Sequence, residues 1–337
     1  MIAINGLGRI GRLALKRLAV GAPARLAAVN DPADLGTLAA LLRRDSVHGA
    51  ESLEILAEVE RGEEFLRLGA ARVRVFHETE PERVPFDGLD VGLVVESSGR
   101  FTRRADAARH LRGGVSHVVI SAPSPDADFT AIQPLNGAGL DPGRHRVVSN
   151  ASCTAHATAP MLRVLRDAFG IAHAGMSTVH VVTNDQRLQD APHKDLRRAR
   201  AAFQSIIPTS SSAFGALHKA LPWLDPAFSG SALRVPTLSV NLVDVTALLE
   251  KDASVESLNA AYRYAAEGSL KGVLALAEPD LVSRDFTGRE ESVLMDLQLT
   301  RVLGSRFVKV FGWHDNETAY AARLVELVLA MAERLSR

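Results

Sequence analysis

The chain opens with an apolar segment, a glycine-rich turn and a segment with helical periodicity, MIAINGLGRIGRLALKRLAV. Gly6, Gly8 and Gly11 form the pattern G-x-G-x-x-G at the point where the predicted strand gives way to the helix. The first glycine permits a tight turn, the second lets the backbone approach a pyrophosphate, and the third lets the helix pack close to the strand. A tight turn into any helix can use the same glycines. In this position, however, they predict a dinucleotide-binding α/β unit.

A second predicted strand, RLAAVND, ends at Asp31. A carboxylate there can accept hydrogen bonds from both ribose hydroxyls of an adenosine, and it would repel the 2′-phosphate of NADP. The alternative role of a strand-end aspartate is to cap the next loop. We expect the carboxylate to bind ribose, so the expected cofactor is NAD.

Further strands are predicted at LDVGLVVESSG, SHVVISAP and HRVVSNAS, each followed by a helical or irregular segment. Alternating strands and helices indicate a parallel, doubly wound sheet. Ligands of such sheets lie at the carboxyl ends of the strands. Ser98 and Ser121 fall at such ends, so we expect them at the cofactor.

The second half of the chain has a different pattern of predicted strands. From about residue 170 its strands are longer and closer together, which is typical of an antiparallel sheet with one buried face. Residues 184–215 carry few strand signals and are predicted to form a long loop, which suggests a functional role. The last segment, 317–337, has the apolar spacing of an amphipathic helix. The predicted fold class is therefore α/β, with a doubly wound sheet followed by an α+β domain that contains an antiparallel sheet.

Bulk properties narrow the function classes. The 337 residues suffice for two domains, and 39 basic side chains balance 39 acidic ones. That balance argues against nucleic acid or a membrane surface as partner. The chain has no apolar run of membrane-spanning length and does not open with a secretory signal pattern. Its single cysteine fits a reducing compartment, so we expect a cytoplasmic protein.

That one cysteine, Cys153, lies in the stretch SNASCTAHATAP. A lone cysteine is more often a small buried hydrophobic residue than a nucleophile. Here a predicted strand ends just before it and a predicted helix starts at it. Free N–H groups at a helix start stabilise a thiolate and lower the pKa of the thiol, and they can stabilise an oxyanion. We therefore expect Cys153 to be a catalytic nucleophile.

A cysteine nucleophile needs a base nearby in space. The candidate is His180, in STVHVVTND, where a predicted strand leads into the long loop. The chain has eleven histidines, so position alone does not single this one out.

Motifs in order along the whole chain carry a family resemblance: INGLGRIGR, LLRRDSVHG, ESSGRFT, SNASCT, HVVTNDQ, PHKDLRRARAA, IIPTS, LRVPT, LVSRDF and WHDNET. The chain resembles the glyceraldehyde-3-phosphate dehydrogenase family, which includes erythrose-4-phosphate dehydrogenases. The resemblance implies a Rossmann NAD-binding domain over 1–152 that is closed by the helix 317–337, a catalytic domain over 153–316, and a homotetramer. It implies no metal.

The resemblance also implies residue roles. Cys153 would attack an aldehyde, His180 would act as base during hydride transfer to NAD, and inorganic phosphate would release an acyl phosphate from the thioester. The residues expected to bind the cofactor are Gly8, Arg9, Ile10, Asp31, Ser98, Ser121 and Asn316. Those expected to hold the phosphate of the substrate are Thr183, Arg200 and Arg234. Those expected near the attacking phosphate are Ser152, Thr154, Ser211 and Ser212. Arg197 and Arg198 are expected to be solvated or at subunit contacts.

The sequence departs from the family pattern close to these positions. Ala155 and His156 replace Thr and Asn after the cysteine, and Ser211-Ser212 replaces a Thr-Gly pair. A serine keeps the hydroxyl, whereas loss of the glycine removes either a close backbone approach or a positive φ. These changes leave the substrate and the acyl acceptor open.

Three hypotheses about the function remain. The first is NAD-dependent oxidation of glyceraldehyde 3-phosphate to an acyl phosphate. The second is a dehydrogenase of erythrose 4-phosphate or another phosphorylated aldehyde with partial hydrolysis of the thioester, or a specialised pathway copy. The third is a protein that binds NAD and acts through partners. Retention of Cys153, His180, Arg200 and Arg234 argues against the third, because binding NAD needs none of them.

Overall fold

The computed structural model describes residues 1–335 and separates into two compact units. Unit 1 comprises Met1–Ser152 together with the segment from Ala321 onward, and unit 2 comprises Cys153–Tyr320. Unit 1 has a largely parallel sheet and unit 2 a largely antiparallel one, so the predicted fold class is confirmed. Within the described residues, no helix combines the length and the apolar character that crossing a membrane requires.

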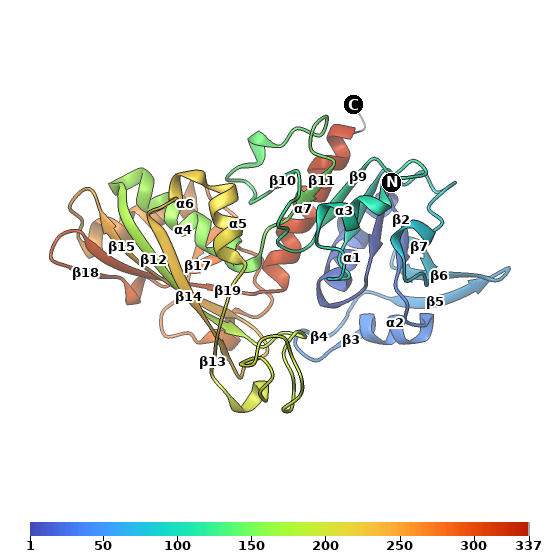
Figure 1. Ribbon diagram of the computed structural model, residues 1–337, viewed down its shortest axis with the longest axis horizontal. Coiled ribbons are helices and arrows are strands. Elements are labelled where there is room, and N and C mark those ends of the chain that lie inside the picture. Colours follow the sequence, from blue (N-terminus) through green and yellow to red (C-terminus); the bar gives the residue numbers. More distant parts are fainter. Residues whose placement is uncertain (336–337) are drawn as a thin grey trace. The chain divides into compact units, whose positions relative to one another are not determined.

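Unit 1 is built on a nine-stranded sheet in the order β10-β11-β9-β8-β1-β2-β7-β6-β5 (Figure 1). All neighbours from β10 to β7 pair in parallel. The strands of unit 1 are β1 (Ile2–Asn5), β2 (Leu26–Asn30), β3 (Arg44–Asp45), β4 (Gly49–Ala50), β5 (Ile55–Glu60), β6 (Glu63–Leu68), β7 (Ala71–Phe76), β8 (Leu93–Glu96), β9 (His117–Ile120), β10 (Phe129–Thr130) and β11 (Val147–Ser149). Its helices are α1 (Arg9–Gly21), α2 (Leu35–Arg43) and α3 (Arg104–Ala107).

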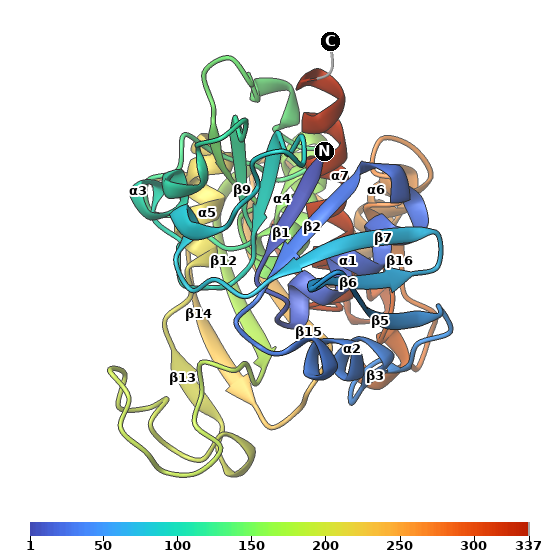
Figure 2. The ribbon, with the colours of Figure 1, turned by 90° about the vertical axis from the view of Figure 1, so that its right-hand side faces the viewer.

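The edge formed by β5, β6 and β7 is antiparallel, and the sequence analysis did not identify it. Its exposed face is charged: Glu58 forms ion pairs with Arg67 and Arg72 across the strands. Only Ile55 of β5 is buried, although most residues of the strand are apolar, and the sequence analysis did not recognise the segment as a strand. Figure 2 shows α2 beside this edge, in contact with β5 and β6.

The C-terminal helix α7 (Thr318–Leu335) packs into the core of unit 1. Its residues from Leu324 to Met331 join the same buried cluster as Leu15 and Leu18 of α1. Near its end, Arg334 donates a hydrogen bond to the Leu140 carbonyl. The amphipathic spacing predicted for 317–337 therefore serves packing, and residues 336–337 lie outside the described chain.

Unit 2 contains an eight-stranded sheet in the order β13-β14-β12-β15-β19-β17-β16, with β18 paired to β19. Two pairs, β12 with β14 and β16 with β17, are parallel and the others are antiparallel. The strands are β12 (Ile171–Val181), β13 (Ile207–Thr209), β14 (Phe228–Val235), β15 (Asn241–Leu249), β16 (Leu274–Leu276), β17 (Val293–Met295), β18 (Arg301–Leu303) and β19 (Phe307–His314). The helices are α4 (Cys153–Phe169), α5 (Ala213–Ala220) and α6 (Val255–Glu267), and α4 packs on β15 and β19.

The long loop predicted at 184–215 is present for most of its length. It runs from the end of β12 to β13 and projects from the sheet of unit 2 (Figure 2). Only β13 and the start of α5 interrupt it, apart from a single 3-10 turn.

The three glycines of the opening turn meet different surroundings. Gly6 has a φ of +92°, and a Cβ on it would lie 2.5 Å from the Ser98 backbone. A Cβ on Gly11 would lie 2.0 Å from the Gly6 carbonyl oxygen. A Cβ on Gly8 would meet nothing within 4 Å. Gly6 and Gly11 are thus required by the fold, while the space beside Gly8 is free for a ligand.

This difference predicts opposite effects on stability. Gly11→Ala should lower the free energy of unfolding by about 3 kcal/mol or more, because the collision is with backbone that cannot rotate away. Gly8→Ala, the matched control, should change it by less than about 0.5 kcal/mol. Urea denaturation of both variants measures the difference. Equal stability of the two variants would contradict the assigned packing.

Candidate functional site

Cys153 is the first residue of α4, and the turn before it is backbone-strained. Ala151 has a φ of 50° and is fully buried, although the left-handed region costs a residue with a side chain about 1 kcal/mol or more. Its N–H donates to the Ser149 hydroxyl, 3.1 Å away. Strain of this kind persists where the surrounding structure over-determines it, and it clusters at functional sites.

The thiol faces a histidine from the sheet. Cys153 Sγ lies 3.6 Å from Nε2 of His180, which is near the end of β12. His180 is buried, and Cys153 keeps some exposed surface. The Thr154 hydroxyl lies 4.0 Å from the sulfur. The sequence prediction that these two side chains meet therefore agrees with the geometry.

Burial determines the resting protonation of this pair. It raises the pKa of the Cys153 thiol, against the opposing effects of the Thr154 hydroxyl and the charge of Arg234. It also holds the pKa of His180 well below its ordinary value, and the charge of Arg234 acts in the same direction. The expectation that the helix start lowers the pKa of the thiol is thus wrong, because desolvation outweighs the local effect. The resting pair is a thiol and a neutral imidazole.

The far side of the His180 ring contacts two groups. Its Nδ1 lies 2.8 Å from the Val181 carbonyl oxygen and 2.8 Å from an Arg234 nitrogen. If Nδ1 carries the proton, it donates to Val181 and leaves Nε2 free to accept a proton from sulfur. If Nδ1 accepts from Arg234, Nε2 carries the proton instead. The first arrangement is the one that a general base requires.

Arg234 lies beside His180 in the neighbouring strand β14 and is opposite it in register. It donates to the Val181 carbonyl and, at 3.3 Å, to the Thr183 hydroxyl. Burial and the nearby charge of Arg198 lower the pKa of Arg234 to about 10, so the guanidinium remains charged at neutral pH. A permanent cation and a hydroxyl therefore lie directly behind the base.

The second arginine of the site is Arg198, which the sequence analysis assigned to solvent or subunit contacts. Its guanidinium donates to the Thr209 hydroxyl at 2.8 Å, to the Ser210 carbonyl at 3.0 Å and to Asp185 at 2.5 Å. Its charge acts on both His180 and Arg234.

Arg200, which was expected to bind the substrate, lies elsewhere. Its side chain is largely exposed and forms an ion pair with Asp190 at 3.0 Å. The two arginines are two residues apart in an irregular loop, and no periodicity tells which of them faces the sheet. The geometry therefore places Arg198 among the charges that act on His180 and Arg234, and Arg200 at the surface.

The segment after β13 carries the departure from the family pattern. The Ser211 hydroxyl accepts a hydrogen bond from the Ala213 N–H at 3.2 Å, at the start of α5. Ser212 has a φ of −72°, which any residue adopts. Of the two reasons offered for a glycine at this position, a positive φ is excluded, and only close approach of backbone to an anion remains.

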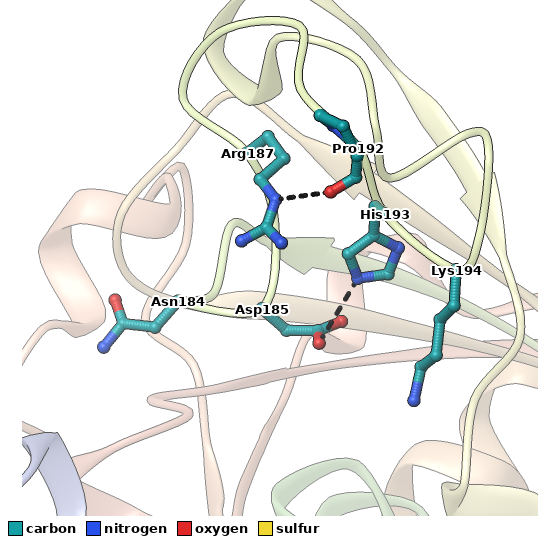
Figure 3. A pocket seen from close by; sticks show the side chains of 6 residues that line it. All are labelled: Asn184, Asp185, Arg187, Pro192, His193 and Lys194. Atoms are coloured by element: carbon teal, nitrogen blue, oxygen red, sulfur yellow. Dashed lines mark hydrogen bonds and ion pairs between the residues drawn. The ribbon is translucent and has the colours of Figure 1, made fainter.

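The loop itself encloses an open hollow that is separate from the thiol. Its lining residues are Asn184, Asp185, Arg187, Pro192, His193 and Lys194 (Figure 3). Arg187 donates to the Pro192 carbonyl at 3.1 Å, and His193 lies 3.5 Å from an Asp185 oxygen. These contacts bind the loop to itself and help to hold Asp185, the partner of Arg198.

The residues expected at the cofactor surround the glycine turn of unit 1. The Asp31 carboxylate accepts from the Leu7 N–H at 2.8 Å and from the Ala33 N–H at 3.0 Å. It therefore organises the turn while lying at the end of β2, where a ribose would be held. Together with the free space at Gly8, this fits a dinucleotide. The Arg9 side chain is paired with Asp45 at 2.7 Å, so it offers backbone rather than charge to phosphates.

The two serines of unit 1 lie at the carboxyl edge of the sheet, as expected. Ser98 donates to Glu96, a buried carboxylate that also accepts from Asn5 and lies 3.0 Å from His110. The Ser121 N–H donates to the Glu96 carbonyl. Ile10 is half-buried in the first turn of α1. The sequence analysis did not identify this carboxylate network beneath the turn.

Two further residues of unit 2 complete the description. The Asn316 side-chain oxygen accepts from the Val240 N–H at 3.2 Å. His156, one turn into α4, is buried against the Tyr320 ring at a centroid distance of 5.9 Å. His156 therefore packs in the interior of unit 2. Ser152 is half-buried just before the thiol.

Comparisons with known proteins agree with this geometry. A family model described as the NAD binding domain of glyceraldehyde 3-phosphate dehydrogenase matches residues 1–104. The model of the C-terminal domain of the same enzyme matches residues 152–316. The chain is 46% identical to the glyceraldehyde-3-phosphate dehydrogenase of Geobacillus stearothermophilus, over 99% of this chain and 98% of that protein.

Other relatives give the same result. Glyceraldehyde-3-phosphate dehydrogenase 1 of Bacillus cereus is 44% identical over 99% of this chain and 98% of its own. The Streptomyces coelicolor enzyme is 42% identical over 99% of both. The predicted NAD cofactor and oxidoreductase class are confirmed by these matches, and the chain belongs to the glyceraldehyde-3-phosphate dehydrogenase family.

Proposed function

We propose that the protein oxidises glyceraldehyde 3-phosphate to an acyl phosphate with NAD as hydride acceptor. One observation supports this most strongly: the Cys153–His180 contact lies beside two arginines, Arg198 and Arg234, that hold hydroxyl groups. A nucleophile with a base suits a carbonyl, and paired arginines suit a phosphate dianion.

The covalent step begins at sulfur. Sγ of Cys153 bonds to the aldehyde carbon while the thiol proton passes through Nε2 of His180 to the carbonyl oxygen, giving a thiohemiacetal. His180 then accepts the hydroxyl proton as the C–H bond breaks, which leaves a thioester on sulfur. The nicotinamide supplies the hydride acceptor when it is bound, and we assign the orientation of its amide to Asn316. Inorganic phosphate attacks the thioester carbon, and the cysteine leaves as thiolate.

Two anions have to be held in this scheme. We assign the phosphate of the substrate to Arg234, Thr183 and Arg198. We assign the attacking phosphate to Thr154, Ser211 and the backbone at Ser152 and Ser212. Charge-assisted hydrogen bonds from arginine forks are stronger than neutral ones, so the two arginines should contribute most of the affinity for substrate.

The domain roles and assembly are also proposals. Unit 1 would bind NAD, at Gly8, Arg9, Ile10, Asp31, Ser98 and Ser121, and unit 2 would carry the chemistry. The carboxylate of Asp31 favours NAD over NADP, whose 2′-phosphate it would repel. Large apolar side chains are exposed along the long loop, at Leu188, Leu196, Phe203 and Ile206. Exposed apolar side chains in one segment fit an interface, which supports a homotetramer, and the free thiol suits the cytoplasm.

A second candidate rests on Ser211-Ser212. If weakened phosphate binding lets water reach the thioester, the same chemistry yields the free acid, as in an erythrose-4-phosphate dehydrogenase. The Ser211-Ser212 departure concerns the acyl acceptor and does not select a longer aldehyde, so glyceraldehyde 3-phosphate remains the proposal.

Cys153→Ser should abolish NADH formation from glyceraldehyde 3-phosphate and NAD. His180→Asn should lower the rate about 10²-fold or more, the usual scale for a lost general base. His173→Asn, an exposed histidine on the same strand, is the matched control and should keep full activity. Activity of the serine variant equal to that of the wild type would exclude the covalent mechanism.

The revised arginine assignment has its own test. Arg198→Leu should raise the KM for glyceraldehyde 3-phosphate about 10–100-fold, the equivalent of about 1.5–3 kcal/mol for a lost charged hydrogen bond. Arg200→Leu should change it less than about threefold, because Arg200 only pairs with Asp190 at the surface. Steady-state kinetics on the two variants decides between them. The reverse order would restore the assignment made from sequence.

The acyl acceptor can be tested by titrating phosphate while measuring acyl phosphate and free acid separately. We expect phosphate to accelerate turnover with a raised half-saturating concentration, which Ser212→Gly should lower by about tenfold if backbone approach is what the serine hinders. Ser210→Gly is the control for added loop flexibility. Tight phosphate saturation and pure acyl phosphate in the wild type would remove the suggested defect, and indifference to phosphate would favour the hydrolytic candidate.

A further inference from the structure

Three buried side chains of unit 2 lie on the adjacent strands β12, β15 and β19. They lie at the strand ends where His180 contacts the Cys153 thiol. His180 is on β12, Asn241 starts β15, and His314 ends β19. Asn241 and His314 are paired in register, and the β12–β15 pairing ends at Val179 and Leu242, one residue short of His180. Asn241 is fully buried and His314 nearly so. The role proposed for His180 uses neither neighbour.

Hydrogen bonds link the three. The Val181 carbonyl is one of the two groups that contact His180 Nδ1, and the N–H of the same residue donates to Asn241 Oδ1 at 2.9 Å. Because Oδ1 accepts there, the Asn241 amide must donate from Nδ2, and it does so to Nε2 of His314 at 3.0 Å. Burial lowers the pKa of His314 to about 3, so Nε2 is available as an acceptor at neutral pH.

The residue before Asn241 is strained. Val240 has a φ of 68°, a conformation that is rare for a β-branched side chain. Its N–H donates to Asn316, the residue assigned to the nicotinamide amide. Strain of this kind persists only where the surrounding structure holds it. The Asn241 side chain, bonded at both ends, provides such a hold directly next to the strained residue.

We propose that Asn241 and His314 are positioning residues for the dehydrogenase reaction, with His314 acting as a neutral acceptor that holds the Asn241 amide. The amide in turn holds the N–H of Val181, the residue whose carbonyl contacts His180, and the Val240 backbone beside Asn316. The inference rests on the proposed function for its kinetic readout. It predicts that removal of the acceptor misplaces the base, and that restoration of an acceptor repairs the defect.

The test compares His314→Phe, which removes the acceptor, with His314→Gln, which can offer a carbonyl oxygen to Asn241. His314→Phe should lower kcat about tenfold or more while KM for the aldehyde stays within about threefold, because misplaced reacting groups slow chemistry rather than binding. His314→Gln should stay within about threefold of wild type in kcat. His218→Phe, a histidine on α5 outside this set, should leave kcat unchanged.

A second readout needs no substrate. The rate at which iodoacetamide alkylates Cys153 at pH 7 depends on His180, so it should fall at least about threefold in His314→Phe and recover in His314→Gln. Asn241→Leu should reproduce the effects of His314→Phe on kcat and on alkylation. The double variant that combines Asn241→Leu with His314→Phe should be no worse than either single variant, because each of them breaks the same hydrogen-bonded linkage. If His314→Phe does not fold, Asn241→Leu and His314→Gln carry the comparison.

Unchanged kcat and alkylation in His314→Phe, or in Asn241→Leu, would overturn the proposal. It would also be overturned if His314→Gln were as impaired as His314→Phe, since shape rather than the acceptor would then matter. Thermal melting of each variant separates lost stability from lost positioning. A wild-type protein without aldehyde oxidation would reject the proposed function alone, and the alkylation rates would still decide whether His314 positions His180.

Discussion

The distance between Cys153 Sγ and His180 Nε2 depends on the packing of α4 against the sheet of unit 2. The helix approaches so closely that a Cβ on Gly312 of β19 would lie 3.0 Å from Met161 of α4. The Thr158 hydroxyl contacts Met176 of β12 at 3.0 Å. Interiors packed at this density transmit small shifts instead of absorbing them. The first turn of α4 is thus placed against β12 by residues that have no chemistry of their own.

Burial of this pair has an electrostatic consequence. A thiolate and an imidazolium would both be costly in a desolvated site, and the pKa directions of Cys153 and His180 show that desolvation prevails there. The charge comes instead from the guanidinium groups of Arg234 and Arg198, and Arg234 keeps its charge at neutral pH because its pKa is lowered only to about 10. Such a site is neutral at the reacting atoms and cationic around them. It therefore attracts a phosphorylated substrate without committing the nucleophile to an ionised resting state.

What the sequence could predict follows from how local each signal is. The glycine turn needs contacts only between a strand, a turn and a helix that are consecutive in the chain, and Gly6, Gly8 and Gly11 behave as their spacing predicts. The antiparallel edge was missed, and its outer strand β5 buries only Ile55. The pKa of Cys153 was predicted in the wrong direction because the helix start is visible in sequence, whereas burial is a tertiary property.

The long loop marks the other limit of prediction. Arg198 and Arg200 are distinguished only by the fold of an irregular segment, in which Arg198 reaches Thr209 and Arg200 reaches Asp190. Asn241 and His314 are 73 residues apart in the chain, and their hydrogen bond depends on the register of β15 against β19. No local pattern contains that information. Residues that support a site from the neighbouring strand are therefore the ones that motif reasoning leaves out.

The Val181 carbonyl brings substrate binding and proton transfer to the same atom. In the unliganded protein this oxygen lies within hydrogen-bond distance of both Arg234 and His180 Nδ1. A phosphate that draws the guanidinium N–H away from the carbonyl leaves Nδ1 as its remaining donor. The imidazole is then held in the tautomer whose Nε2 faces sulfur with a free lone pair. On the proposed function, the anion that identifies the substrate would thus also prepare the base, through the carbonyl of Val181, the residue whose N–H is bonded to Asn241.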